Sequence, residues 1–337
     1  MLILGIECTA HTFGCGIANS NGEILANVNS EYIPISGGIH PREAARHHAS
    51  VAALVIRDAL RNAGKSISEI DGFAVSLGPG LGPCLRVGAT VARALSLYYN
   101  KPLIPVNHCV AHIEIARLTC KVDDPLVVYV SGGNTIISAF SDGKYRVFGE
   151  TLDIALGNCL DTFARYIGLP HPGGPHIERL ASKGSNYINL PYVVKGQDMS
   201  FSGLLTMAIR KFKDGIALED LCFSLQETAF SMVCEVTERA LVHTGKDAIL
   251  LTGGVAANKR LRIMMESIAK EHGVVFKAVP MEYARDNGAM IAWTGVLSLM
   301  HNVTITVEDS FIRPRWRLDA VDIPWRVSAH EVNKEGC

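Results

Sequence analysis

The sequence predicts an α/β protein built from two duplicated lobes. Two segments follow one plan: an apolar strand, a turn of small residues, a second strand, a turn ending in glycine, and a third strand. The first copy spans residues 2–30 with its turn at Asn21-Gly22, and the second spans residues 125–151 with its turn at Asp142-Gly143. Two copies about 120 residues apart indicate a duplicated core rather than one continuous sheet.

Two further elements are expected between these copies. Residues 43–63 place apolar side chains at helical spacing and are followed by Gly64, a typical helix C-cap. Residues 70–100 read as a strand, a loop containing three glycines, and a helix. That order can bind an anion, but the loop has no Walker lysine and no dinucleotide fingerprint, so a tight turn is the favoured interpretation.

The second half of the chain contains two more predicted units. Residues 248–273 read as a strand, a Gly-Gly turn and a helix, with Asn258 near the helix start, where a nucleotide edge could dock. Residues 169–180 are rich in proline and glycine, so we expect a loop that leads into a helix near Ile177. No linker composition separates the halves, which predicts one tightly connected body.

Composition limits the classes of protein. With 337 residues, 48% hydrophobic and 19% charged, the chain has enough apolar material for a two-lobed globular protein. Its nine cysteines include no C-x-x-C pair, and no apolar stretch is long enough to cross a membrane, so we expect a cytoplasmic location without membrane attachment.

The formal net charge of −1 excludes a global field that would attract nucleic acid. Any nucleic-acid contact must then come from local patches or from partners. Two basic patches are visible, at residues 40–48 and 313–317, and the second alternates arginines around a tryptophan. Each patch could equally be a solvated surface.

His108 and His112 are four residues apart, in the segment "NHCVAHIE". On a helix this spacing puts both imidazoles on one face, where they could share a metal ion. The alternative is two histidines that happen to share a helix face. The spacing alone does not decide between them, because a metal site needs further ligands.

Several separated motifs resemble those of one family. They are "GIHPREAARHH", "SLGPGLGPCLRVG", "NHCVAHIE", "YVSGGNT", "ALGNCLDTFARYIGL", "VKGQDMSFSGL", "LTGGVAANKRLR" and "ARDNGAMIAW". Together, from about residue 2 to residue 326, they resemble the universal tRNA N6-adenosine threonylcarbamoyltransferase family, in its archaeal and eukaryotic form, the catalytic subunit of the KEOPS complex. The distinguishing residue is Tyr129, where bacterial relatives usually carry serine.

The resemblance implies an actin-like, sugar-kinase-like (ASKHA) fold of two lobes with a central cleft. We place the N-terminal lobe at residues 1–122, completed by residues 295–337. The second lobe is then residues 123–294, which would carry most of the nucleotide and metal site.

For the metal, the resemblance implies the ligands His108, His112, Tyr129 and Asp286. Two imidazoles, a phenolic oxygen and a carboxylate suit one divalent ion per subunit, iron in preference to zinc, and suit calcium poorly. Taken alone, Asp286 could instead be a helix N-cap.

For the nucleotide part of the substrate, the resemblance implies contacts from a glycine turn and four separate residues. These are Tyr129, Val130, Ser131, Gly132, Gly133, Asn134, Asp161, Gly174, Glu178 and Asn258. The turn glycines would let the backbone approach a phosphate, and the two carboxylates could hold ribose hydroxyls. Singly, Asp161 could be an exposed helix carboxylate and Glu178 a first-turn acid.

The implied reaction transfers a threonylcarbamoyl group from threonylcarbamoyl-AMP to N6 of adenosine 37, beside the anticodon, in tRNAs that read codons beginning with A. The product is threonylcarbamoyladenosine, and the site could also hold ATP or its analogues. The sequence assigns no general base. The implied partners are tRNA and other KEOPS subunits: a small kinase-like ATPase, a dimerising subunit at the N-terminal lobe, and a further small subunit.

Three other classes of protein are alternatives to this enzyme. A metallopeptidase is disfavoured, because the residue after the first histidine is Cys109, where the zincin helix needs glutamate. An ATP-hydrolysing or small-molecule kinase of the same fold would explain a nucleotide site, but not a histidine-rich ligand set. The density of polar motifs argues against a non-enzymatic scaffold.

Overall fold

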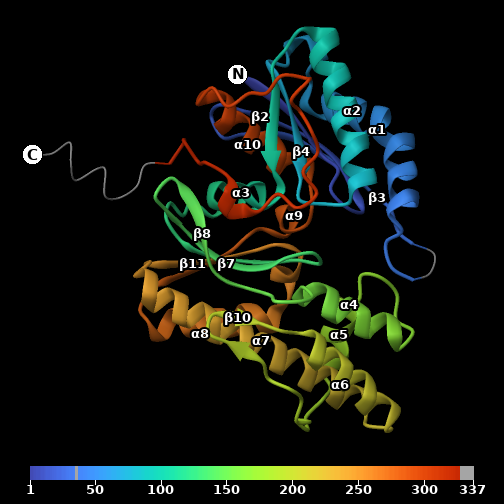
Figure 1. Ribbon diagram of the computed structural model, residues 1–337, viewed down its shortest axis with the longest axis vertical. Helices are drawn as coiled ribbons and strands as arrows, with labels where there is room; N and C mark the ends of the chain where they lie inside the picture. The colour runs from blue at the N-terminus through green and yellow to red at the C-terminus, as the bar shows by residue number, and fades with distance from the viewer. Residues whose placement is uncertain (35–36, 327–337) are drawn as a thin grey trace, which may run out of the picture. The chain divides into compact units, whose positions relative to one another are not determined.

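The two predicted strand plans form two five-stranded sheets with the same strand order. The computed structural model in Figure 1 describes residues 1–34 and 37–326. One sheet has the order β3-β2-β1-β4-β5 and the other the order β8-β7-β6-β11-β12. Strand β1 pairs antiparallel with β2 and parallel with β4. In the same way, β6 pairs antiparallel with β7 and parallel with β11. The predicted α/β class and the duplication are confirmed.

The chain divides into two compact units. The first contains residues 1–34, 37–119, 141–145 and 286–326, and the second contains residues 120–140 and 146–285. Residues 286–294, expected in the second lobe, have their contacts in the first unit. The C-terminal residues 327–337 of the predicted N-terminal lobe lie outside the described residues.

The first unit holds one complete sheet and its helices. Its strands are β1 (Leu2–Glu7), β2 (Thr12–Asn19), β3 (Ile24–Glu31), β4 (Gly72–Gly78) and β5 (Leu103–Asn107). Its helices are α1 (Pro41–Ala63), α2 (Gly82–Tyr99), α3 (His108–Cys120) and α10 (Gly288–Met300), with short 3-10 turns at Ile67–Glu69 and Leu318–Ala320. Figure 1 shows α1 and α2 side by side, and their residues are in contact.

Strand β1 has two faces that contact different helices. Leu4, Ile6 and Cys8 point into the hydrophobic core that also contains residues of α1 and α2. Since side chains alternate along a strand, Gly5 and Glu7 point to the opposite face. That face meets α10: a Cβ added to Gly5 would lie 2.1 Å from the amide nitrogen of Ala292. Glu7 therefore lies on the α10 side of the sheet.

Helix α10 packs on the sheet backbone to backbone. A Cβ on Gly16 of β2 would lie 2.3 Å from the Ala289 nitrogen, and one on Gly288 would lie 2.2 Å from the Cys15 carbonyl carbon. Real side chains do not fit at such distances, so these positions must be glycine. This close contact fixes the start of α10, where Asp286 lies.

The second unit holds the other sheet and its helices. Its strands are β6 (Leu126–Val130), β7 (Thr135–Ser141), β8 (Lys144–Glu150), β11 (Ala248–Thr252) and β12 (Val275–Ala278), with a small hairpin of β9 (Val194–Lys195) and β10 (Asp198–Met199). Its helices are α4 (Leu156–Tyr166), α5 (Gly174–Ala181), α6 (Ser202–Lys213), α7 (Leu218–Thr244), the 3-10 turn η2 (Gly254–Ala257), α8 (Lys259–Glu271) and α9 (Met281–Ala284).

The predicted end of α1 is confirmed, whereas α5 starts earlier than predicted. Gly64 ends α1 in the left-handed conformation at φ 62°, as a C-cap glycine should. Helix α5 begins at Gly174, earlier than the predicted start near Ile177. The reason is Pro175, since a proline in the first helical turn loses no hydrogen bond. No helix among the described residues is long and apolar enough to cross a membrane.

Candidate metal centre

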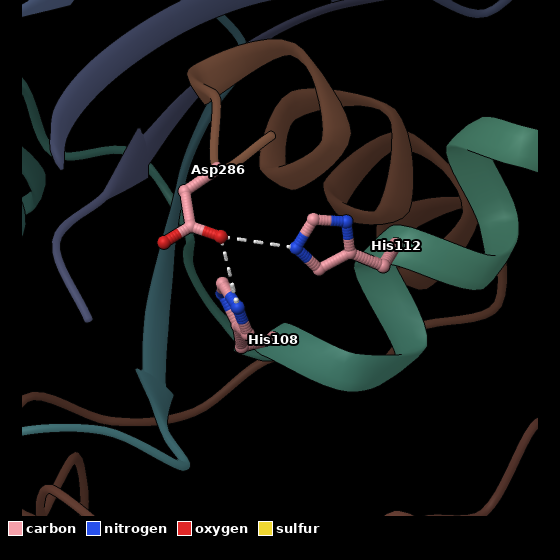
Figure 2. A group of neighbouring side chains, drawn as sticks. All are labelled: His108, His112 and Asp286. Atoms are coloured by element: carbon pink, nitrogen blue, oxygen red, sulfur yellow. Dashed lines mark hydrogen bonds and ion pairs between the residues drawn. The ribbon is translucent and has the colours of Figure 1, made fainter. Parts of the chain in front are cut away.

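His108, His112 and Asp286 converge in the first unit. Figure 2 shows both imidazoles, which α3 presents, facing the carboxylate from the segment before α10. The Oδ1 atom of Asp286 lies 3.4 Å from His108 Nε2 and 3.2 Å from His112 Nε2. One ligand atom from each residue lies within 4.8 Å of the others, and the two rings are 4.7 Å apart at 84°. The predicted helical pair thus meets a third ligand.

The start of α3 is held by Asn107. Its Oδ1 accepts hydrogen bonds from the amides of Cys109 (2.9 Å) and Val110 (3.2 Å). These bonds satisfy two amides of the first turn, as an N-cap side chain does. Every residue from His108 to Ala116 is buried, so the helix lies inside the unit and its histidines cannot move freely.

Asp286 is not a helix N-cap. That role belongs to Asn287, whose Oδ1 accepts a hydrogen bond from the Met290 amide at 3.0 Å. The carboxylate of Asp286 is thereby available to the two histidines. The N-cap role that the sequence allowed for Asp286 is therefore wrong, and its carboxylate lies where a metal ligand could lie.

Glu7 adds a second carboxylate behind His108. Its Oε2 lies 3.0 Å from His108 Nδ1, and its Oε1 accepts hydrogen bonds from the Thr9 amide (2.7 Å) and hydroxyl (2.5 Å). Glu7 is completely buried. A carboxylate on one imidazole nitrogen, with the other nitrogen directed at a ligand position, is the usual arrangement around metal-binding histidines.

The pKa values of the two histidines are shifted in opposite directions, upward at His108 and downward at His112. Burial lowers the pKa of both rings, but the neighbouring Glu7 and Asp286 carboxylates outweigh burial at His108 and raise its pKa to about 10. Burial would raise the pKa of Asp286, yet the charge and hydrogen bond of His108 hold it well below its usual range. A cation bound to Nε2 of His108 would take the place of that proton.

The donor set fits a transition metal. Two imidazole nitrogens and one carboxylate oxygen, buried and backed by a further carboxylate, are the ligand types of iron and zinc sites rather than of calcium sites. Tyr129, the fourth predicted ligand, ends β6 in the second unit, where Asn134 Nδ2 lies 3.5 Å from its hydroxyl. Its role as a ligand stays a prediction.

The predicted glycine turn lies at the carboxyl edge of the second sheet. Thr252 of β11 pairs with Tyr129 of the parallel strand β6, so the turns that follow these strands are neighbours. Within the first turn, Ser131 Oγ accepts a hydrogen bond from the Asn134 amide at 3.0 Å. A Cβ on Gly132 or Gly133 would have no described atom within 4 Å, which leaves room for a ligand there.

The other predicted nucleotide residues form two short networks in the second unit. Asp161 Oδ1 accepts hydrogen bonds from the amides of Gly173 (2.7 Å) and Gly174 (3.2 Å). Glu178 Oε1 accepts one from the Lys259 amide at 2.8 Å. Asp161 therefore shapes the turn before α5, and Glu178 connects α5 to the start of α8.

Asn258 has a structural role that the sequence did not predict. It caps α8, where its Oδ1 accepts hydrogen bonds from the amides of Arg260 and Leu261, and its Nδ2 donates to Gln226 at 2.9 Å. The side chain is 6% exposed. Its contact with a nucleotide stays a prediction.

In the first basic patch, residues 40–48, two histidines are bonded inside the unit, whereas His40, Arg42 and Arg46 are exposed. His48 is buried with its Nε2 2.9 Å from the Ala10 carbonyl oxygen, and His47 Nε2 lies 3.0 Å from Ser30 Oγ. Arg46 pairs with Glu43 at 2.9 Å. These contacts favour a structural role for His47 and His48.

Comparisons with known proteins agree on one family and one fold. Residues 23–293 match the family model for tRNA N6-adenosine threonylcarbamoyltransferase. A relative of that description from Thermofilum pendens is 60% identical over 325 residues, covering 96% of this chain and 97% of the relative.

Among solved structures, HypF from T. kodakarensis is similar with a TM-score of 0.64, 16% identity, and coverage of 89% of this chain and 48% of HypF. Component A of (R)-2-hydroxyglutaryl-CoA dehydratase from Acidaminococcus fermentans gives 0.56 at 16% identity, covering 88% and 98%. At such identities the likeness concerns the fold alone, which is the actin-like, sugar-kinase-like fold.

Proposed function

Because the chain belongs to the tRNA N6-adenosine threonylcarbamoyltransferase family, we propose that His108, His112 and Asp286 hold a divalent metal ion that serves this reaction. The protein is an enzyme that forms threonylcarbamoyladenosine in tRNA. The observation that carries the metal proposal is the approach of two imidazole Nε2 atoms to one carboxylate oxygen, at 3.4 and 3.2 Å.

The residues around this group have distinct tasks. Glu7 accepts the Nδ1 proton of His108, which directs Nε2 of that ring toward the proposed ion. The backbone contacts of α10 hold Asp286 in place opposite α3. A bound divalent ion would supply Lewis acidity toward an oxygen of the transferred group. Iron is proposed ahead of zinc, and Tyr129 as the fourth ligand.

The acyl donor is proposed to be threonylcarbamoyl-AMP, held in the second unit. The amides of Ser131, Gly133 and Asn134 donate within the turn, so the Gly132 amide is the one proposed to donate to the phosphate, and the open positions of Gly132 and Gly133 leave space for it. Four residues of the second unit are proposed to contact the nucleoside. They lie on α4, on α5 and at the start of α8, and are Asp161, Gly174, Glu178 and Asn258. The acceptor is proposed to be N6 of adenosine 37.

The alternative classes lose support from the surroundings of the histidines. In a zincin the general-base glutamate lies on the metal side of the ligands. Glu7 instead meets the Nδ1 side of His108, away from Asp286, and Cys109 is a buried residue whose thiol pKa is raised to about 12 by burial. A kinase of this fold would have no use for the histidine pair.

The substrate partner is tRNA, and we propose other KEOPS subunits as protein partners. Helices α1 and α2, which pack together, expose Leu54, Leu97 and Tyr98, which are 49%, 65% and 83% exposed. Exposed apolar side chains on these two helices support the proposal of a dimerising subunit on the first unit. The eight cysteines of the described residues are free thiols, which is consistent with the predicted reducing cytoplasm.

The proposal is tested by incubating tRNA with the protein, its partners and threonylcarbamoyl-AMP, followed by nucleoside mass spectrometry. We expect threonylcarbamoyladenosine to form, and a chelator added before the substrates to abolish it. A reaction that proceeds at full rate after complete metal removal would contradict the metal's role, while the family activity would still stand.

A further inference from the structure

The second basic patch forms an accessible pocket in the first unit. Residues 313–317, which we name the arginine segment, contribute most of its lining. The pocket has a volume of about 720 Å³ and is lined by Arg313, Pro314, Arg315, Trp316, Arg317 and Ala320. All three arginines are exposed, and the guanidinium of Arg313 lies over the Trp316 ring at 4.7 Å.

The arginine segment is firmly anchored to the unit. The Arg313 amide donates to the Leu77 carbonyl oxygen (2.7 Å), and the Gly80 amide donates to that of Pro314 (3.1 Å). Gly78 has a φ of +152°, and a Cβ there would lie 1.9 Å from the Arg313 carbonyl oxygen. The glycine loop after β4 is thus in close backbone contact with this segment.

A further anchor connects the arginine segment to the metal-binding helix. Asn107 Nδ2 donates to the Trp316 carbonyl oxygen at 3.2 Å, while its Oδ1 caps α3 one residue before His108. Strands β1, β4 and β5 are parallel, so the residues that end them, Glu7, Gly78 and Asn107, share one sheet edge. The pocket and the candidate metal centre therefore lie at the same edge, where ligands of open α/β sheets bind.

The charges of the arginine segment are only partly neutralised. Arg317 pairs with Asp319 at 3.0 Å. Across residues 1–34 and 37–326, neither Arg313 nor Arg315 forms an ion pair, and Arg313 instead stacks on the indole. Fixed cations beside an aromatic ring match a phosphate backbone with an unpaired base, because every base offers a flat face for stacking.

We propose that the arginine segment binds a single-stranded stretch of the tRNA substrate, with a phosphate on Arg315 and one unpaired base in the pocket against the Arg313 guanidinium that Trp316 supports. The inference rests on the proposed function for the identity of the nucleic acid. It adds a binding site that no motif match assigns. It also gives this near-neutral chain its own contact with tRNA.

The test is equilibrium binding of fluorescent tRNA to the full chain over a series of salt concentrations. Arg315→Glu should weaken binding at least about fivefold and lower the slope of log K against log salt by roughly 0.7 to 0.9 per lost phosphate contact. The matched control is Arg146→Glu, an exposed arginine of the second unit whose replacement changes the net charge equally, and binding should stay within about twofold.

Stacking is tested separately at Trp316. Trp316→Phe keeps a stacking ring and should bind tRNA nearly as well, whereas Trp316→Ala should lose roughly 5- to 100-fold. An oligoribonucleotide should quench tryptophan fluorescence of the wild-type protein, with the quenching reduced in Trp316→Phe. Because Trp316 is partly buried against the core, the urea unfolding midpoint of Trp316→Ala is measured as well, and a loss of binding counts only if the variant is folded under the assay conditions.

Two results would overturn the inference. One is unchanged tRNA affinity and salt slope in Arg315→Glu, or an equal loss in Arg146→Glu. The other is an acidic peptide that displaces tRNA from the arginine segment as well as an oligoribonucleotide does, which would indicate a protein partner. Either can occur while the wild-type protein still makes threonylcarbamoyladenosine, so failure of this inference is separable from failure of the proposed function.

Discussion

At the scale of single residues, Glu7 is the main addition of the structure to the predicted metal site. It stands in an apolar strand, "LILGIECT", where a charged side chain is out of place. Buried acids are rare unless they are paired, so this misplacement was the available signal. The partner could not be predicted from sequence, because Glu7 and His108 are 101 residues apart and meet only through the parallel sheet edge.

Glu7→Gln should weaken metal binding. The amide keeps the size of the side chain but loses the charge that orients and polarises the His108 ring, and loss of such a partner costs about 10- to 100-fold in affinity. The measurement is chelator competition at the most alkaline pH the protein tolerates, where protons compete least with the metal. Glu43→Gln on α1 is the control, and equal affinity of Glu7→Gln and wild type would contradict the role.

Glu7→Gln should also change the pH dependence of metal binding. In the wild type the raised pKa of His108, about 10, means that the metal must displace a proton at neutral pH, so affinity rises as pH rises. Without the Glu7 charge this pKa falls, and the affinity should depend less on pH around neutrality. A steeper dependence in Glu7→Gln than in wild type would show that Glu7 does not hold the proton on His108.

At the scale of elements, the helix that carries Asp286 depends on its glycine contacts. The sequence predicted a helix start near Asp286 but not the helix's packing, because backbone contacts at Gly5, Gly16 and Gly288 leave no hydrophobic periodicity to detect. By contrast, the strand plans, the helix ending at Gly64 and the turn at 131–134 follow local rules and were predicted correctly.

Gly16→Ala should displace α10 from the sheet. The added methyl would meet the Ala289 nitrogen at 2.3 Å, a contact with backbone that no rotamer relieves, so we expect a loss of about 1–3 kcal/mol in unfolding free energy. Because Asp286 precedes α10, metal content should fall as well. Gly203→Ala in α6 is the control, since its Cβ meets nothing within 4 Å. Unfolding at the same urea midpoint in Gly16→Ala and wild type would rule out tight packing.

Helix α1 should make stability depend on pH through His48. Burial lowers the pKa of His48 to about 4, although its bond to the Ala10 carbonyl oxygen opposes this shift. An unfolded histidine titrates near 6.5, so between these values the unfolded chain binds more protons. The free energy of unfolding should therefore fall as pH drops from about 6.5 to about 4, by up to roughly 1.4 kcal/mol per unit.

The pH effect is measured by urea unfolding of His48→Gln and wild type across this range. The difference between their unfolding free energies should change with pH, because only the wild type carries the buried histidine. Ser50→Ala, which replaces an exposed residue of the same helix without a titratable group, should run parallel to wild type. Parallel curves for His48→Gln would mean that His48 does not titrate abnormally.

At the scale of the whole molecule, duplication gives each unit its own sheet edge with polar residues. Each sheet ends its parallel strands at one edge, and polar residues follow those strands in both copies: Glu7 and His108 in the first unit, the turn at 131–134 in the second. The repeat was visible in the sequence as two strand plans. Residues 286–294 have their contacts in the first unit because most of them belong to α10, which packs on β1 and β2.

The most direct test of the account compares the wild type with His108→Ala plus His112→Ala. Both proteins are purified without added metal, analysed for iron and zinc, and assayed for threonylcarbamoyladenosine in tRNA by mass spectrometry, with His243→Ala, an exposed histidine of α7, as control. We predict about one divalent ion per wild-type chain, and neither metal nor product from the double variant. A folded double variant that makes the product at the wild-type rate would contradict the metal centre.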